Sequence, residues 1–183
     1  MKKNLAFAVL STVSLTVATF TIAVPAPAQV FGNHNSNAPV NFNAGRIEVQ
    51  DRTDRVVLSG AVRVEQAGLV LNASRMTVAY SNSGGIDVNR IDASGGVTIQ
   101  KAGDTARGDV AIYDLNRRLI TLVGGVTLQQ GNGNRISGGR VIIDLNSGRS
   151  TIDGRSTGTA NPGTTGNDGR VTGTFTVPQR QKQ

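Results

Sequence analysis

One phrase occurs three times in this chain: Leu58-Ser-Gly-Ala-Val-Arg-Val64, Ala93-Ser-Gly-Gly-Val-Thr-Ile99 and Leu122-Val-Gly-Gly-Val-Thr-Leu128. Each copy starts with a small or apolar residue, passes through glycine, and ends with apolar residues at alternate positions. A second motif repeats as well, because Asp114-Leu-Asn occurs again 30 residues later as Asp144-Leu-Asn. A strand-like repeat with a period near 30 residues predicts stacked β-units and excludes a helix bundle or a lone catalytic loop.

Apolar and polar side chains alternate along most of the middle of the chain. Val62 and Val64 fall on one side of their segment, with charged neighbours on the other, which is the period of a half-buried strand. The alternation breaks near Ala73-Ser-Arg75. An extra residue there predicts a bulge or a corner, where a strand bends from one sheet to another.

Glycine and aspartate recur at fixed points of the repeat. The recurring glycines are Gly60, Gly95, Gly124 and Gly154. We expect each of them to mark a corner or bulge where a side chain would clash. Asp114 and Asp144 each precede Leu-Asn at an expected turn, where an Asx turn explains them better than a pair of catalytic carboxylates.

The two ends of the chain differ from its middle. Two lysines, an apolar run and Ala26-Pro-Ala28 predict a signal peptide cleaved after Ala28, and hence an exported protein. The apolar run is also about long enough for an uncleaved membrane anchor. The expected organisation is a signal peptide in 1–28, a flexible lead-in in 29–45, the β domain in 46–154, and a Gly/Thr-rich, mostly disordered tail in 155–183. Within that tail, residues 170–177 alternate again and predict either an edge strand or a strand formed only against a partner.

Charge and composition exclude several classes of function. Lysine and arginine exceed acidic residues by 19 to 12, but much of this excess lies in the leader and the tail. Nucleic-acid binding favours clustered basic residues with aromatic side chains between them. Here the arginines are dispersed and tryptophan is absent, so we expect no nucleic-acid partner.

Residues that carry common catalytic chemistry are scarce. The chain has no cysteine, which removes disulfides and thiolate chemistry, and His34 is its single histidine. One histidine in a polar lead-in disfavours a Ser-His-Asp triad and cannot form a multi-histidine metal site. We therefore expect a protein without enzymatic activity, metal or cofactor.

Short motifs in a fixed order resemble the OstA/LptA family. They are Ile91-Asp-Ala-Ser-Gly-Gly-Val-Thr-Ile99, Leu122-x-Gly-Gly-Val-Thr-Leu128 and Ile136-x-Gly-Gly, and the resemblance covers roughly residues 39–154. It implies an all-β fold, an open antiparallel β-jellyroll in which two sheets built from repeated strand units form a V-shaped trough.

The same resemblance implies a non-enzymatic carrier of lipopolysaccharide. Such a protein lies in the periplasm, binds the lipid A acyl chains, and bridges the inner and outer membranes across the periplasm for outer-membrane assembly. The implied partners are an LptC-like inner-membrane protein at the N-terminal edge around 46–50 and an LptD-like outer-membrane protein at the C-terminal edge near 141–152. Head-to-tail self-association is implied too. If the leader stays uncleaved, an inner-membrane-anchored LptC-like component fits better.

A trough of this kind needs an apolar lining, which the alternating residues supply. The candidates are Val62, Val64, Met76, Val78, Tyr80, Val97, Ile99, Tyr113, Ile120, Leu122, Val126, Leu128, Val141 and Ile143. The alternative for any of them is ordinary packing of sheet on sheet.

Two other classes of protein remain open from the residues alone. A structural β-solenoid or surface scaffold would have the same repeat around a closed, dry core. An envelope glycan-binding module or hydrolase is disfavoured, because the chain lacks tryptophan and has only two tyrosines for stacking on sugars.

Overall fold

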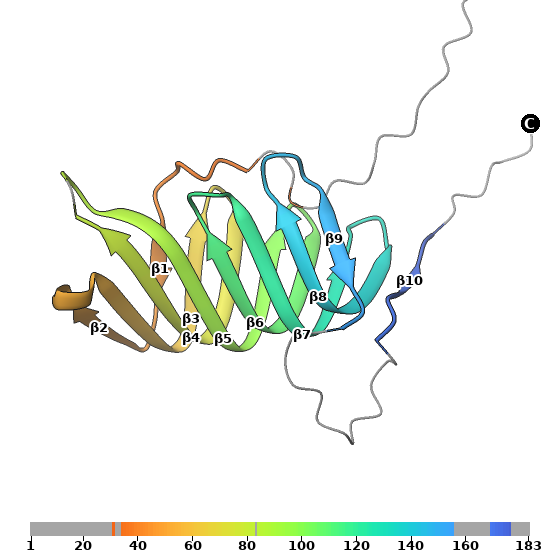
Figure 1. The fold of residues 1–183 in the computed structure, drawn as a ribbon, viewed down its shortest axis with the longest axis horizontal. Helices are drawn as coiled ribbons and strands as arrows, with labels where there is room; N and C mark the ends of the chain where they lie inside the picture. Colours follow the sequence, from red (N-terminus) through yellow and green to blue (C-terminus); the bar gives the residue numbers. More distant parts are fainter. Residues whose placement is uncertain (1–30, 32–33, 83, 156–168, 177–183) are drawn as a thin grey trace, which may run out of the picture.

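Strands follow one another along nearly the whole of the described chain. The computed structural model describes residues 31, 34–82, 84–155 and 169–176 (Figure 1). The strands are β1 (Asn41–Asn43), β2 (Arg46–Gln50), β3 (Arg55–Gln66), β4 (Leu69–Ser81), β5 (Asp87–Lys101), β6 (Asp104–Asp114), β7 (Leu119–Gln129), β8 (Arg135–Asp144), β9 (Ser150–Asp153) and β10 (Thr172–Thr174). A single 3-10 turn, η1 (Asp51–Thr53), joins β2 to β3 among these residues. No helix in the described part of the chain is long and apolar enough to cross a membrane.

All strands belong to one antiparallel sheet. Its order is β1-β3-β4-β5-β6-β7-β8-β10, with β2 also paired to β3 and β9 also paired to β8. Each long strand therefore pairs with the strands that precede and follow it in the sequence. The all-β prediction from the 30-residue repeat is confirmed.

The long strands are all folded at one point, so the sheet bends into two limbs. Between β5 and β6 the register shifts from Ser94 to Val97, and equivalent shifts occur in every other pair of long strands. Gly95 and Gly96 occupy this point with φ of +83° and +79°, a region that glycine enters without steric cost. The predicted corners at Gly60, Gly95 and Gly124 are confirmed, as is the irregularity at residues 73–75.

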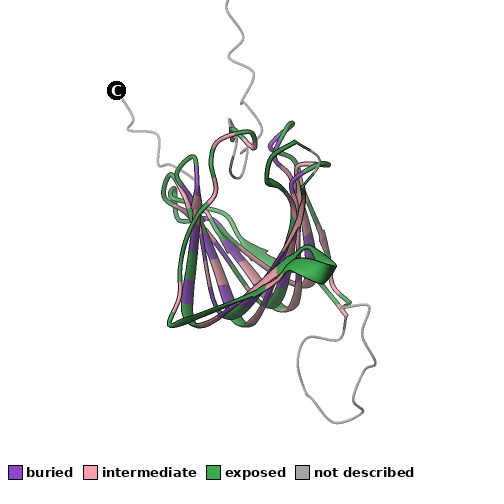
Figure 2. Cartoon of the chain, turned by 90° about the vertical axis from the view of Figure 1, so that its left-hand side faces the viewer, coloured by how far each residue is buried: buried purple, intermediate pink, exposed green. Residues whose placement is uncertain are grey.

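The two limbs are named here by the residues on either side of these corners. Limb A contains residues 55–59, 75–81, 87–94, 110–114, 119–123 and 140–144, and limb B contains residues 62–66, 69–73, 97–101, 104–108, 126–129 and 135–138. The end view shows the limbs meeting below and separating above, which gives the expected open V (Figure 2). Both limbs belong to one continuous sheet that is creased at the corners.

At each end of the sheet, two short strands take the place of one long bent strand, one on each limb. β2 pairs with the limb A part of β3, and β1 pairs with its limb B part. Gly45 joins them at the corner, where its N–H donates to the Gly60 carbonyl at 2.8 Å. At the other end β9 covers the limb A part of β8, and β10 covers its limb B part.

The tight turns at the free end of limb A use aspartate side chains. The backbone N–H of Arg117 donates to Asp114 Oδ1 at 2.9 Å, and that of Asn146 donates to Asp144 Oδ1 at 2.8 Å. The hydrogen bond from Asn146 is the main cause that lowers the pKa of Asp144. The predicted Asx turns are thus confirmed, and both carboxylates serve the backbone.

Candidate functional site

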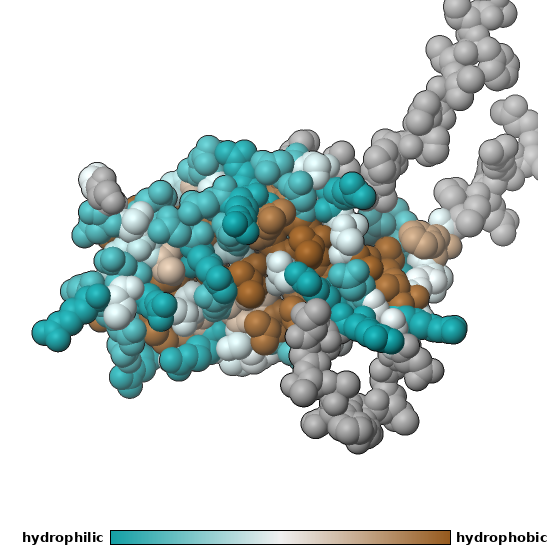
Figure 3. All heavy atoms as spheres, viewed as in Figure 1, coloured by the Kyte–Doolittle hydropathy of each residue, from teal (hydrophilic) through white to brown (hydrophobic). Residues whose placement is uncertain are grey.

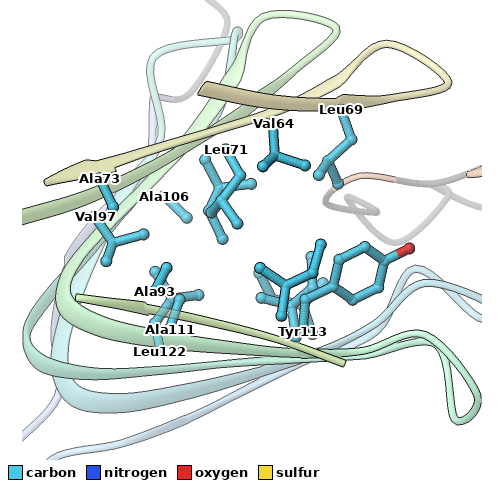
Figure 4. Close-up of a cluster of buried hydrophobic side chains, with 14 of the residues drawn as sticks. Val64, Leu69, Leu71, Ala73, Ala93, Val97, Ala106, Ala111, Tyr113 and Leu122 are labelled. Carbon is cyan, nitrogen blue, oxygen red and sulfur yellow. The ribbon is translucent and has the colours of Figure 1, made fainter. Parts of the chain in front are cut away.

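The interior of the V is a continuous aliphatic surface built from alternate residues of every long strand. Because paired residues of antiparallel strands face the same side, Val64, Leu71 and Ile99 form one row across limb B. Met76, Ala93 and Ala111 form a corresponding row across limb A. Figure 4 shows such side chains from the two limbs pointing toward one another across the interior.

Thirteen of the fourteen predicted lining residues lie together in this interior as members of one buried apolar cluster. Tyr80 is the exception, since it is half-buried near the end of β4 and lies outside the cluster. The prediction missed further members: Phe31, Leu58, Leu69, Leu71, Ala73, Ile91, Ala93, Ala106, Ala111, Leu115 and Leu145. Most of these follow the same alternation as their predicted neighbours, so the periodicity could have found them. Phe31 has no such signal, because it lies in the Asn-rich lead-in.

The interior is filled by its own side chains. Met76, Ile91 and Ile99 are each 0% exposed. Full burial of one aliphatic side chain contributes roughly 1.5–3 kcal/mol, so this filled interior is also the core that stabilises the fold. A guest can enter only where the limbs separate or where something already seated moves out.

Charged groups are excluded from this interior. The buried polar residues among those described are Gln66 and Asn134, and none of the buried residues is ionised. The described residues contain no group of three or more His, Asp or Glu side chains placed to hold a metal ion. The interior surface therefore suits an apolar guest.

The two limbs are joined by hydrogen bonds at their free ends, the mouth of the V. Gln66 ends β3 on limb B and Tyr113 lies near the end of β6 on limb A. The Tyr113 hydroxyl donates to Gln66 Oε1 at 2.7 Å, so one hydrogen bond spans the mouth. Burial raises the pKa of Tyr113, which keeps its hydroxyl protonated as the donor.

A segment near the N-terminus lies in the same mouth; we call Phe31 and residues 34–40 the mouth segment. Gln66 Nε2 donates to the carbonyls of Ser36 and Ala38 at 2.8 and 2.9 Å. His34 Nε2 lies 3.2 Å from Gln66 Oε1 and 3.1 Å from the Tyr113 hydroxyl. Burial lowers the pKa of His34, and its Nδ1 is buried without a hydrogen-bond partner, so the neutral ring fits this position. Residues expected to be a flexible lead-in thus contact both limbs.

Apolar side chains continue the interior surface to both ends of the sheet. Ile47 and Val49 on β2 pair with interior residues of β3, yet they are 49% and 59% exposed because no strand lies beyond them. At the other end, Val171 and Phe175 flank β10 on its interior side and are 44% and 65% exposed. The interior track therefore opens at each end on uncovered apolar residues.

The outermost strands differ in part from the expected edges. β2 spans the expected N-terminal edge, residues 46–50, and β1 lies beside it on limb B. Val141 was placed at the C-terminal edge, but β9 pairs with it and covers it. The outermost strands at that end are β9 and β10.

The outer faces of the two limbs differ in polarity. Limb B presents residues such as Arg63, Arg107 and Arg135, whereas limb A carries an apolar patch over β6, β7 and β8 (Figure 3). Val110, at 40% exposure, belongs to this patch. Strict alternation of apolar interior and polar exterior therefore holds better on limb B than on limb A.

An open, creased antiparallel sheet with an uncharged aliphatic interior defines an open β-jellyroll. Residues 41–149 match the family described as "LptA/(LptD N-terminal domain) LPS transport protein". The chain therefore belongs to this family of lipopolysaccharide-transport proteins.

Individual proteins are also similar to this chain. An uncharacterized protein of Rhizobium meliloti (strain 1021) is 27% identical over 126 residues, which cover 65% of this chain and 67% of the relative. Among solved structures, LptH from Pseudomonas aeruginosa superposes with a TM-score of 0.66 at 17% identity, covering 78% of this chain and 98% of LptH. LptH is described as the LptA-homologous periplasmic component of the conserved lipopolysaccharide transport device. This second likeness shows that the fold is shared.

Proposed function

We propose that this protein carries lipopolysaccharide across the periplasm by holding its acyl chains in the interior of the V. The main observation in support of this proposal is the uncharged aliphatic track that runs the length of the sheet and ends on exposed apolar residues at both ends. Membership of a lipopolysaccharide-transport family supports the identity of the cargo. The sugar and phosphate head stays outside, since the interior offers no charged partner.

The energetics favour a carrier of this form. Each methylene group removed from water contributes about 0.8 kcal/mol, so several acyl chains left in water would cost tens of kcal/mol. The trough lowers this cost along its whole length and therefore gives no position at which the lipid is trapped. Transport along such a track needs work supplied from outside the protein.

Bridging of the two membranes follows from the two sheet edges. Unpaired N–H and C=O groups on an outer strand are templates for a further strand. We place an LptC-like inner-membrane protein at the β1–β2 edge and an LptD-like outer-membrane protein at the β9–β10 edge. A second copy joined head to tail would extend the same track, because a heterologous contact can repeat.

Photo-crosslinking from single positions tests the cargo and the face that carries it. A photoreactive amino acid at the interior positions Val78 or Leu128 should capture lipopolysaccharide in cells. The matched controls are Arg63 and Thr127, which lie on the outer face one residue away from interior positions. Equal capture from both faces would contradict the interior as the binding surface.

The periplasmic location and the bridging role are tested separately. The mass of the mature protein should correspond to cleavage after Ala28, and an uncleaved leader would favour the membrane-anchored alternative. Depletion of the protein should cause lipopolysaccharide to accumulate at the inner membrane. Normal delivery to the outer membrane after depletion would contradict the bridging role.

A further inference from the structure

The mouth of the V is closed by part of the chain itself. Figure 2 shows the described part of the N-terminal region lying between the upper ends of the two limbs. Its hydrogen bonds reach Gln66 on limb B and Tyr113 on limb A. The mouth segment therefore occupies the side of the trough through which a lipid chain would pass.

Phe31 occupies a seat within the apolar cluster of the trough. It is 2% exposed and belongs to the same cluster as the interior residues of both limbs. Its neighbours along the described segment, residues 34–40, are all half-buried or exposed. Phe31 is thus the one fully buried apolar side chain among the described residues of the segment, and Val40 also packs against the cluster.

The buried amide of Gln66 is satisfied within the closed mouth. The Gln66 side chain donates to two carbonyls of the mouth segment and accepts from Tyr113, so both ends of its amide are used. Gln66 itself is only 2% exposed, and a buried amide without such partners would be costly. The closed mouth therefore satisfies this amide without a lipid, while Nδ1 of His34 stays without a hydrogen-bond partner.

The mouth segment has room to move aside. A pocket of about 450 Å³ lies next to it, lined by residues 36–40 of the segment, by Gln66 of limb B, and by residues 86–88, 115, 116 and 118 at the free end of limb A. Hydrogen bonds that involve His34, Ser36 and Ala38 hold the segment to Gln66 and Tyr113, while an acyl chain brings more methylene groups to the seat than one phenylalanine does. Replacing Phe31 with a lipid chain would thus increase the apolar surface that is removed from water at the seat.

We propose that the mouth segment is a displaceable internal ligand: Phe31 holds the seat of an acyl chain at the mouth, and a lipid chain enters by displacing it. This inference rests on the proposed lipopolysaccharide cargo and adds where the chain enters and what it replaces. In the lipid-free protein the segment keeps the trough closed and dry. Loading opens the mouth by breaking the hydrogen bonds at Gln66 and Tyr113.

A reversible tether tests whether the segment must move. Asn37 and Asn116 are exposed and line the same pocket, one on the segment and one on limb A. Because the chain has no native cysteine, the Asn37→Cys, Asn116→Cys protein can be bridged specifically by a bifunctional thiosulfonate reagent and released with dithiothreitol. We expect the tethered protein to bind purified lipopolysaccharide at least about tenfold more weakly than the released protein. Each single-cysteine protein, treated with the same reagent, controls for modification alone.

The outcomes separate this inference from the proposed function. Equal affinity in the tethered and released forms would overturn displacement while leaving lipopolysaccharide binding intact. Failure of the untethered wild-type protein to bind lipopolysaccharide would instead overturn the proposed function, and this inference with it.

A second pair of variants tests the seat of Phe31. Phe31→Ala empties the seat and should raise the association rate for lipopolysaccharide several-fold, whereas Phe31→Leu refills it with an apolar side chain and should not. The circular dichroism spectrum of each variant reports whether the sheet is retained. An unchanged association rate in a folded Phe31→Ala protein would contradict the assignment.

Discussion

At the corner of β5, two adjacent glycines with the same backbone conformation have different surroundings. A Cβ built on Gly95 would lie 2.8 Å from the Cβ of Ser74, whose hydroxyl donates to the Gly95 carbonyl at 2.7 Å. A Cβ on Gly96 would meet nothing within 4 Å. Substitution of Gly96 therefore measures the free-energy cost of a positive φ alone, whereas substitution of Gly95 adds the cost of a steric clash with the neighbouring strand.

We therefore expect Gly96→Ala to lower the free energy of unfolding by about 1–2 kcal/mol, which is the strain of a left-handed alanine. Gly95→Ala should cost about 1–3 kcal/mol more, since the corner must also shift away from Ser74. Urea unfolding of both variants and the wild type measures the difference. Equal costs would show that the strands at this corner can separate freely.

A second residue-scale effect concerns protonation of His34 in the mouth. Its pKa is lowered by burial, and the cation of Lys101 lowers it further, while Gln66 opposes them. Since the open or unfolded protein binds a proton more readily than the closed one, His34 favours closure above roughly pH 6.5 and opposes it below.

The stability of the wild type relative to His34→Gln should accordingly fall as pH decreases from 7.5 to 5. Urea unfolding at both pH values gives this difference, and the shared carboxylates cancel in the comparison. A difference that does not change with pH would place His34 outside the closed mouth.

At the scale of elements, the repeat predicted the long strands well because each is defined by its own sequence. The alternation of apolar and polar residues predicted which side of each strand faces the interior, and the recurrent glycines predicted the corners at residues 60, 95 and 124. The mouth could not be predicted, because the contacts of His34 with Gln66 and Tyr113 join residues 32 and 79 positions apart. Local periodicity carries no information on such contacts, and an Asn-rich segment has the composition of a flexible one.

β10 is a three-residue strand that pairs only with β8, and its loss should therefore affect a limited part of β8. It covers residues 135–137 of β8, whereas β9 covers residues 140–143. A chain truncated after Asp153 should keep slow amide exchange at 141–143 and exchange faster at 135–137. Hydrogen exchange by NMR measures both regions in one sample.

Truncation after Thr176 is the matched control, because it keeps β10 and the hydrogen bond from the Thr176 N–H to Asn134 Oδ1 at 2.9 Å. Its exchange at 135–137 should equal that of the full chain. Unchanged exchange in the shorter truncation would mean that β10 gives β8 no protection.

At the scale of the whole molecule, a filled interior and an open V together imply movement. The interior residues are buried without a ligand, so lipid loading must widen the angle between the limbs or displace the mouth segment. The corners permit such widening, because each is a bulge where the ladder of hydrogen bonds is already interrupted.

Widening predicts that spin labels at Ala67→Cys, in the turn at the end of limb B, and Asn116→Cys, in the turn at the end of limb A, move apart when lipopolysaccharide binds. Both residues are exposed in turns at the free ends of the limbs. Labels at Ala67→Cys and Ala102→Cys, which share limb B, should keep their separation. Pulsed dipolar spectroscopy measures both distances, and lipid binding without change in the first pair would rule out widening at this position.

The order of the strands has a consequence for how the molecule is made. Because the long strands β3 to β8 pair with one another in sequence order, a chain that emerges N-terminus first can build this part of the sheet one strand at a time, each on the edge left by the last. The mouth segment is the exception, for its partner Tyr113 emerges late although the segment itself emerges early. The growing protein thus keeps its apolar interior uncovered until β6 is in place, and this is the period in which it most needs protection from aggregation.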